Sequence, residues 1–294
     1  MYNLRYHIVS IVAVFLALAL GLVLGGLIGD KATSTSQAGL VSSITDQFRA
    51  TREESARVSD ENKRLNAFGA DALTSMTKGS LTGKTILVIG AQGNASKYTT
   101  QLLQKAGATV LTADIKADAY QASNKGLASV KLTSDLKTQF KADDDLTALA
   151  QGFAAEWSIP TTAAVDLQGA EGLAPHPVTD ALQTDGIVKL SGGGADINQI
   201  DGVVDVALKG KDAPDAFGLT LAQAFKKQNV PAIVVQEDAS TATLATAAVE
   251  QNLCATNLLM TPPGDWTVVA VLNGADQAPY GTLSGADQLY PPVR

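Results

Sequence analysis

Apolar residues form one unbroken run near the start of the chain. Between Ile8 and Ile28, Ser10 is the only polar side chain. A helix of about 21 residues rises about 31 Å, which matches the hydrocarbon core of a bilayer. The run therefore predicts a single membrane helix, and the more polar remainder of the chain predicts a large water-soluble part.

This run could be a signal peptide that is removed or an anchor that stays. Its apolar core is longer than the usual length of about 7–15 residues for a signal peptide, and no obvious small-residue cleavage site precedes Lys31. We therefore expect residues 1–30 to form an uncleaved signal anchor. Arg5 and the short N-terminal head favour a cytoplasmic N-terminus. The expected location is the cell membrane, with a single pass and the bulk of the chain outside the cytoplasm.

Small residues recur at every fourth position of this predicted helix. They are Ala13, Ala17, Gly21, Gly25 and Gly29. This spacing lets two backbones approach closely, as in helix pairs of the GxxxG type. The alternative is that glycine and alanine are simply frequent in membrane helices. We expect helix–helix packing along this face, either in a homodimer or with another membrane protein.

Residues 31–78 combine a short polar linker with a charged segment that carries an apolar seam. The seam consists of Val41, Ile44, Phe48, Val58, Leu65, Ala72 and Met76, and it is interrupted by Thr51, Ser55, Asn62 and Gly69. Alternating three- and four-residue spacing over about five heptads is typical of a coiled coil. Asn62 would occupy an a position, where asparagine can fix the register of a two-stranded coil. The alternative is a lone amphipathic helix folded against the globular part.

Residues 79–294 alternate strand-like and helix-like segments. A β-branched run at 84–90, a helix capped by Asn94 or Ser96, and a run at 108–113 predict one βαβ unit. Further predicted strands are 127–132, 186–190, 203–208, 231–235 and 268–272, and further predicted helices are 146–157, 178–183, 219–228 and 241–252. The predicted fold class is therefore α/β: an N-terminal membrane helix, a coiled-coil stalk and a doubly wound, mostly parallel sheet of five or six strands.

Charge and cysteine content narrow the function. The formal net charge is −7 and the Lys and Arg residues are scattered, which argues against nucleic-acid binding. Cys254 is the only cysteine, so the chain has no internal disulfide. Neither a G-x-S-x-G nor an H-E-x-x-H motif occurs. A reactive pair of Cys254 and His176 stays open beside the alternative of a small buried thiol, and we do not expect an enzyme.

Three loops contain residues that could bind a ligand. Gly90 and Gly93 follow the first strand and form half of a dinucleotide fingerprint, with Asp114 where a ribose-binding acid would lie, but the third glycine is missing. A tight turn explains these glycines equally well. Residues 191–194 (SGGG) could cradle an anion or form a flexible connection. Residues 143–145 (DDD) could attract a cation or begin a helix in solvent.

Soft side chains that suit Cu(I) are few. Cys254 and Met260 are six residues apart, and His176 is the only histidine of the predicted globular domain. These three residues are weak candidates for metal ligands, and packing in the core is the alternative. The residues indicate no resident cofactor.

The N-terminal sequence resembles a known family. The stretch that carries the resemblance is Leu4-Arg5-Tyr6-His7-Ile8-Val9-Ser10, followed by Val14-Phe15-Leu16-Ala17-Leu18-Ala19 and the glycine ladder. It resembles the opening of the actinobacterial MctB copper-transporter family, and the layout of anchor, stalk and α/β domain agrees over the whole chain. The resemblance implies a non-catalytic envelope protein of copper transport or efflux, with copper as the possible ligand.

The SteB branch of the same family implies an alternative. It suggests a dimeric extracytoplasmic scaffold that binds a membrane protein or a cell-wall hydrolase and so regulates cell separation or peptidoglycan hydrolysis. A single helix cannot enclose a pore, and the predicted small-residue face carries no ionisable group that would mark an ion path. The residues themselves therefore favour partner binding.

Overall fold

The computed structural model describes most of the chain. The described residues are 4–27, 34–90, 93–116, 128–158, 176–193, 197, 199–207, 216–237 and 244–292. Within these ranges, only the backbone is described for residues 4–10, 24–27, 34–42, 128, 130–131 and 216. The chain divides into two compact units, Met1–Leu65 and Asn66–Arg294.

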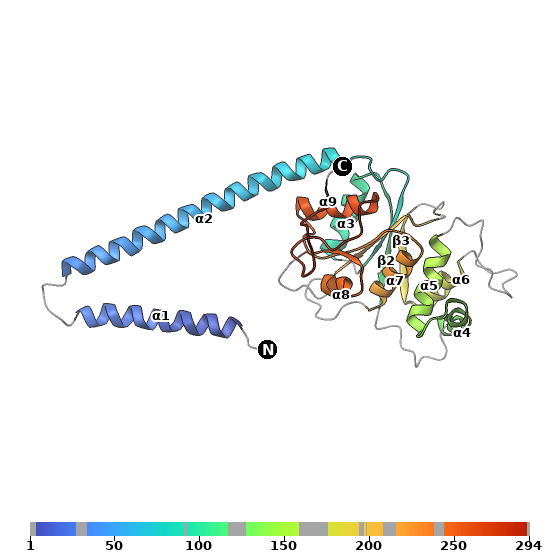
Figure 1. Ribbon diagram of the computed structural model, residues 1–294, viewed down its shortest axis with the longest axis horizontal. Coiled ribbons are helices and arrows are strands. Elements are labelled where there is room, and N and C mark those ends of the chain that lie inside the picture. Colours follow the sequence, from blue (N-terminus) through green and yellow to red (C-terminus); the bar gives the residue numbers. More distant parts are fainter. Residues whose placement is uncertain are drawn as a thin grey trace. The chain divides into compact units, whose positions relative to one another are not determined.

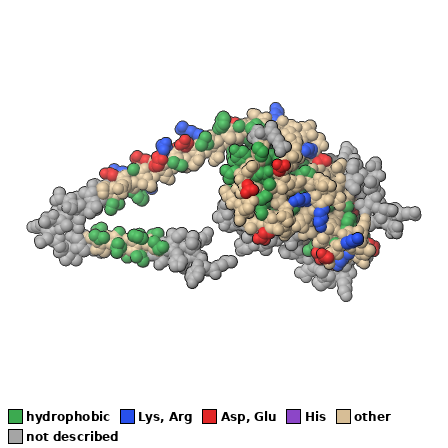
Figure 2. Space-filling view, in the orientation of Figure 1, with side chains coloured by type: hydrophobic (Ala, Val, Ile, Leu, Met, Phe, Trp, Pro, Cys, Tyr) green, Lys and Arg blue, Asp and Glu red, His purple; other side chains and the backbone are tan. Residues whose placement is uncertain are grey.

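The first unit begins with α1 (Leu4–Leu27), which forms where the apolar run predicts a helix. Its described side chains, residues 11–23, are all exposed and are mostly hydrophobic (Figure 2). A Cβ atom at Gly21 would meet nothing within 4 Å, so this position is open to a neighbour. Gly29 lies outside the described residues. Among the residues that the structure describes, no helix is long and apolar enough to cross a membrane.

The second helix, α2 (Ser34–Thr77), is continuous over 44 residues. This confirms the predicted helix at 41–76. Glycine costs about 1 kcal/mol in a helix interior, yet Gly69 does not interrupt α2. The pairing of α2 with a second helix remains a prediction. The side chain of Val41 lies outside the described set.

The second unit is built on a six-stranded sheet. Its strands are β1 (Thr85–Ile89), β2 (Thr109–Ile115), β3 (Val188–Gly192), β4 (Gly202–Val206), β5 (Ala232–Val235) and β6 (Cys254–Thr256). The strand order is β3-β2-β1-β4-β5-β6, and every pair is parallel except β2 with β3. The doubly wound, mostly parallel sheet is therefore confirmed.

Helices cover both faces of this sheet (Figure 1). One face carries α3 (Asn94–Lys105) and α9 (Pro262–Leu272), and the other carries α4 (Ala128–Phe140), α5 (Asp145–Ser158), α6 (Pro177–Thr184), α7 (Ala216–Lys227) and α8 (Leu244–Glu250). Alternate strand residues point into the two cores, since Leu87 and Ile89 belong to one cluster while Ile86 and Val88 belong to the other. The result is a three-layer α/β/α domain.

Two predicted strands are wrong. Residues 127–132 were expected as a strand, but α4 begins at Ala128 and buries Ser129, Thr133 and Leu136, which share one helical face. Residues 268–272 were also expected as a strand, but they form the second half of α9. All of them are buried, so this helix lacks the amphipathic period that would distinguish it from a buried strand.

The N-terminus of α3 differs from the prediction that Asn94 or Ser96 caps this helix. Gly93 is the N-cap of α3 and makes no side-chain cap bond, so neither Asn94 nor Ser96 caps this helix. In α9, the Thr261 hydroxyl accepts a hydrogen bond from the Gly264 amide and prolines occupy the first turn. This start signal outweighs the strand propensity of the valines that follow.

The last three turns of α2 belong to the α/β unit. Leu73 and Thr77 are buried, and Leu73 joins the core cluster beneath α3 and α9. A Cβ atom at Gly69 would lie 2.9 Å from Cγ of Pro262, so the backbone of α2 approaches the first turn of α9 closely. These three residues are spaced by four, and they form the face of α2 that packs on the domain.

Candidate functional site

An extended apolar seam lies exposed along α2. Ile44, Phe48 and Leu65 are each more than 60% exposed, and Val58 is 43% exposed. Asn62 lies among them on the same helix and is exposed too. Figure 2 shows hydrophobic side chains along α2 between acidic and basic ones. A helix that is fully surrounded by solvent has no use for an apolar stripe. Such a stripe is typical of a helix that packs against a partner helix.

The stripe continues below Leu65 with a changed spacing. Phe68 is 73% exposed and Met76 is 47% exposed, with half-buried Ala72 between them. Gly69 was expected in the seam, but its Cα faces Pro262 of the same chain. The sequence analysis passed over Phe68, because it falls outside a strict heptad counted from the residues upstream.

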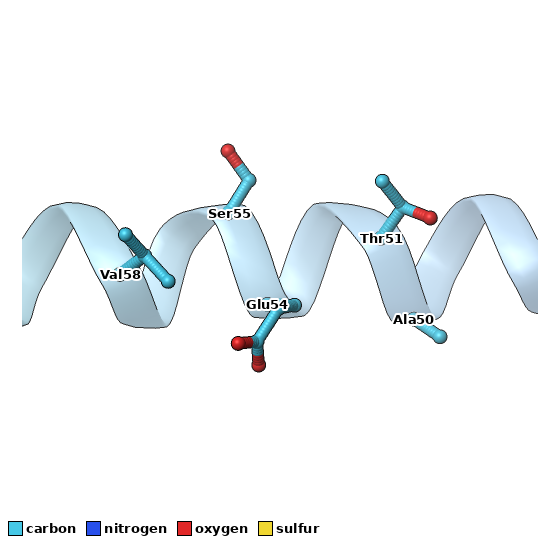
Figure 3. Close-up of a pocket in the computed structure, with 5 residues that line it drawn as sticks. All are labelled: Ala50, Thr51, Glu54, Ser55 and Val58. Carbon is cyan, nitrogen blue, oxygen red and sulfur yellow. The ribbon is translucent and has the colours of Figure 1, made fainter.

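A hollow on α2 is lined by Ala50, Thr51, Glu54, Ser55 and Val58 (Figure 3). All five residues come from this one helix and all are exposed. In the close-up, the Ser55 and Thr51 side chains rise on one side of the helix while those of Glu54 and Ala50 lie on the other. The hollow is thus a shallow part of the helix surface. Val58 belongs to the predicted seam, and Thr51 and Ser55 are two of the polar residues that interrupt it.

The three candidate metal ligands lie apart in the fold. Cys254 is buried in the core beneath α3 and α9, whereas His176 stacks on Trp157, which belongs to the core on the opposite face. Met260 is 39% exposed and precedes α9, with a left-handed backbone (φ 68°). Within the described part of the chain, no three His, Cys, Asp or Glu side chains lie where they could jointly hold a metal ion.

The chemistry of Cys254 and His176 follows from burial. The Cys254 thiol donates a hydrogen bond to the Ala278 carbonyl at 2.9 Å, and burial raises the pKa of this thiol to about 12. The residue is therefore a protonated thiol at neutral pH, which disfavours nucleophilic attack. Burial also lowers the pKa of His176, whose ring lies 4.1 Å from the Trp157 ring in a parallel stack.

The glycine-rich loops have structural explanations. Gly90 has a φ of 140°, and a Cβ atom there would lie 2.8 Å from the Val206 carbonyl oxygen, so glycine is required where β1 and β4 end side by side. Ser191 and Gly192 belong to β3, which corrects the expected flexible connection. The Gly193 amide donates to the Val110 carbonyl and is therefore used within the sheet.

The acidic triplet 143–145 begins α5. Both carboxylate oxygens of Asp144 accept hydrogen bonds from Thr147, one from its amide and one from its hydroxyl. The Thr147 amide bond lowers the pKa of Asp144. Asp145 pairs with Lys137 at 3.0 Å. The interpretation as a helix start is confirmed.

Glu156 and Asp265 are buried carboxyl groups that the sequence analysis did not single out. Glu156 accepts hydrogen bonds from the Val178 amide, the Thr179 amide and the Thr179 hydroxyl, and so ties the end of α5 to the start of α6. The Thr179 hydroxyl in turn accepts from the indole N–H of Trp157. Burial raises the pKa of Glu156 to about 7. The only sequence signal was an acid inside an apolar helical segment.

Asp265 is the second buried acid, in the first turn of α9. It accepts hydrogen bonds from the Tyr98 hydroxyl and from the Met260 amide. Burial raises the pKa of Asp265 to about 6. The pair joins α3 to α9, and the bond to Met260 holds the left-handed turn that precedes the helix.

The carboxyl ends of the parallel strands form the usual ligand-binding edge of such a sheet, at the switch point between β1 and β4. Asp205 is buried near the end of β4, and a Cβ atom at Gly218 would lie 3.0 Å from its carboxylate. This places the carboxylate against the first turn of α7, where the helix dipole favours a negative charge. Residues 91–92, 208–215 and 238–243 lie outside the described residues.

These features define a class of protein: a doubly wound α/β domain whose N-terminal side continues into a long helix with an exposed apolar face. The family described as copper transport outer membrane protein, MctB, matches residues 1–291, and the chain belongs to this family. This confirms the resemblance seen at the N-terminus. Membership implies a copper-transport-related protein of the cell envelope, in a family of transport proteins and not of enzymes. Comparison with curated proteins and with solved structures gives no significant match.

Proposed function

We propose that this protein is a membrane-anchored, extracytoplasmic assembly protein of copper transport, which acts by holding partners together. The observation that carries the proposal is the exposed apolar stripe along α2. In this proposal α1 anchors the chain with its N-terminus inside the cytoplasm. Two copies of α2 pair in parallel, and the α/β domains serve partners outside the membrane.

The proposal is supported by three features of the chain. The apolar run at 8–28 has the length of a membrane span, and its small residues offer a face for close helix packing. The seam of α2 repeats with the heptad spacing of a two-stranded coil. Asn62, exposed in the single chain, would gain a partner amide from the second copy.

Cysteine crosslinking of the full-length protein in its membrane tests the pairing. In a Cys254→Ser background, Asn62→Cys places one thiol in the seam and Asp60→Cys places one on the outer face. A disulfide requires Cα atoms within about 7 Å, which a seam pair provides and an outer-face pair does not. We expect a covalent dimer from Asn62→Cys alone. Equal yields from the two variants, or none from either, would refute a parallel coil.

The membrane segment has its own test. A Gly21→Ile, Gly25→Ile double variant fills the small-residue face, while Leu22→Ile leaves it open. If α1 helices pair through this face, the double variant lowers the yield of the Asn62→Cys dimer and the control does not. An unchanged yield would restrict the pairing to α2.

Direct copper binding and a scaffold role can be separated. The scaffold alternative, in which a membrane protein or a cell-wall hydrolase binds and cell separation is regulated, is favoured by the same exposed stripe. Direct copper binding is tested by copper titration of fragment 66–294, with the Cys254→Ser variant as control. Stoichiometric binding that is lost in the variant would favour metal handling. Co-purification of a partner that depends on residues 41–76 would favour the scaffold.

A further inference from the structure

The last three turns of α2 carry two different apolar faces. Gly69, Leu73 and Thr77 face the chain's own α/β domain. Phe68 and Met76 remain exposed beside that face. At 73%, Phe68 is the most exposed large hydrophobic residue in the part of the chain that the structure describes. A single chain therefore leaves this second face uncovered.

The spacing of the exposed face changes at Leu65. Upstream, apolar positions follow the three- and four-residue alternation of a heptad. From Leu65 this face continues through Phe68, half-buried Ala72 and Met76, so the steps are three, four and four. Eleven residues over three turns correspond to a nearly straight helix, because an 11-residue repeat unwinds the left-handed supercoil. The apolar face therefore continues from Leu65 to Met76, and the neighbouring face of Gly69, Leu73 and Thr77 packs on the domain.

Charges on α2 select the direction of a partner helix. In the heptad that places Asn62 at a, the g positions are Gln47, Glu54 and Glu61, and the e positions are Arg52, Ser59 and Asn66. A parallel partner brings g against e of the next heptad, which sets Glu54 beside Ser59 and Glu61 beside Asn66. A parallel partner therefore also sets Gln47 beside Arg52. An antiparallel partner would bring g against g, and so acid against acid. Charge therefore favours a second copy in the same direction.

We infer that a second copy of this chain covers the stripe of Phe68, Ala72 and Met76, so that pairing continues beyond Leu65 to the base of the α/β domains. This inference rests on the proposed parallel pairing of α2 and extends it. In such a pair, Phe68 of one copy packs on Phe68 of the other. The two domains are then held beside one another by a straight segment of paired helices.

Crosslinking of the full chain in its membrane tests this surface. In the Cys254→Ser background, Phe68→Cys is compared with Ala67→Cys, whose exposed position faces away from the stripe. We expect Phe68→Cys to form a covalent dimer about as efficiently as Asn62→Cys, and Ala67→Cys to form little. If Asn62→Cys crosslinks and Phe68→Cys behaves like Ala67→Cys, the inference is wrong while the proposed pairing stands. If Phe68→Cys crosslinks and Asn62→Cys does not, the lower stripe pairs but the upper coil does not.

A second variant measures the energy of the contact. Phe68→Ser removes a side chain that is exposed in the protomer, so it should leave the unfolding of the α/β domain unchanged. Since two phenylalanines would be buried across the pair, we expect the dimer dissociation constant of Phe68→Ser in detergent solution to be roughly 10–100-fold higher than that of the wild type. Ala67→Ser is the matched control. Unchanged dimer affinity in Phe68→Ser would overturn the inference.

Discussion

Two buried acids dominate the chemistry of the α/β domain at the scale of single residues. Glu156 is 7% exposed and Asp265 is 3% exposed, and each joins two helices through its hydrogen bonds. Desolvation outweighs these bonds in both cases, so each pKa lies above its ordinary value. Both groups therefore bind a proton more tightly in the folded chain than in the unfolded one.

Stability should fall as the pH rises through neutrality. The pKa of Glu156 is about 7 in the folded state against 4.5 for a free group, so its contribution is full below pH 4.5 and is lost as the pH rises through about 7. The corresponding window for Asp265 lies between 3.8 and about 6. We expect the unfolding free energy of fragment 66–294 to be about 3 kcal/mol lower at pH 8 than at pH 5, as measured by urea denaturation.

Glu156→Gln provides the matched comparison. Glutamine does not titrate, so the decline between pH 6 and pH 8 should flatten in this variant. Asp265→Asn should flatten only the part of the curve below about pH 6. A Glu156→Gln variant that keeps the full wild-type slope would contradict the assignment of this pKa.

Cys254 should be inert in the folded protein. Its side chain is fully buried, its thiol is hydrogen-bonded, and burial raises its pKa to about 12. A maleimide reagent at pH 7.5 should therefore label the native protein at a rate at least about 100-fold below that of the urea-unfolded chain. Rapid labelling of the native form would show that this thiol is accessible.

At the scale of elements, the amphipathic helices and the buried parallel strands β1 and β5 were predictable, but the buried helix α9 was not. The run before Gly90 and the segment 231–235 were predicted as strands and form β1 and β5, because short β-branched runs are typical of buried parallel strands. α9 was mistaken for a strand, since a helix buried on all sides has no apolar period. β6 has three residues, which is too short for any pattern.

Some residues of the candidate site could be predicted from the sequence and others could not. The exposed seam of α2 could be predicted, because solvent imposes a period on a surface helix. Glu156 could not be identified, since its environment is created by α6, which lies beyond a separate stretch of the chain. Phe68 was overlooked for a related reason: the domain contact at Gly69 shifts the exposed face away from the heptad.

The start of α9 offers a test of packing. A Cβ atom at Gly264 would lie 2.0 Å from the Leu258 carbonyl oxygen, which is backbone and cannot turn aside. Gly264→Ala should therefore destabilise the domain by about 3 kcal/mol or more in a denaturant titration. At Gly274 a Cβ atom would meet nothing within 4 Å, and only its φ of 101° opposes substitution. Gly274→Ala should cost about 1 kcal/mol, and equal losses in the two variants would be inconsistent with this packing.

At the scale of the whole molecule, the α/β unit includes the end of the long helix. Leu73 is buried in the core and Gly69 lies against Pro262. Fragment 78–294 lacks both residues, whereas fragment 66–294 keeps them. We expect the shorter fragment to lose about 2–4 kcal/mol of unfolding free energy, as judged from its urea midpoint. Equal midpoints would mean that the end of α2 adds nothing to the fold.

The turns of α2 that contain Gly69, Leu73 and Thr77 pack on the α/β domain. Each residue of a helix advances the azimuth by about 100°, and α2 has no break between Ser34 and Thr77. Inserting one alanine between Leu65 and Phe68 would therefore swing every upstream side chain by about a quarter-turn relative to the domain-facing turns. The register between the heptad positions of α2 and its domain-contacting positions Gly69, Leu73 and Thr77 is therefore set by the number of residues that separate them.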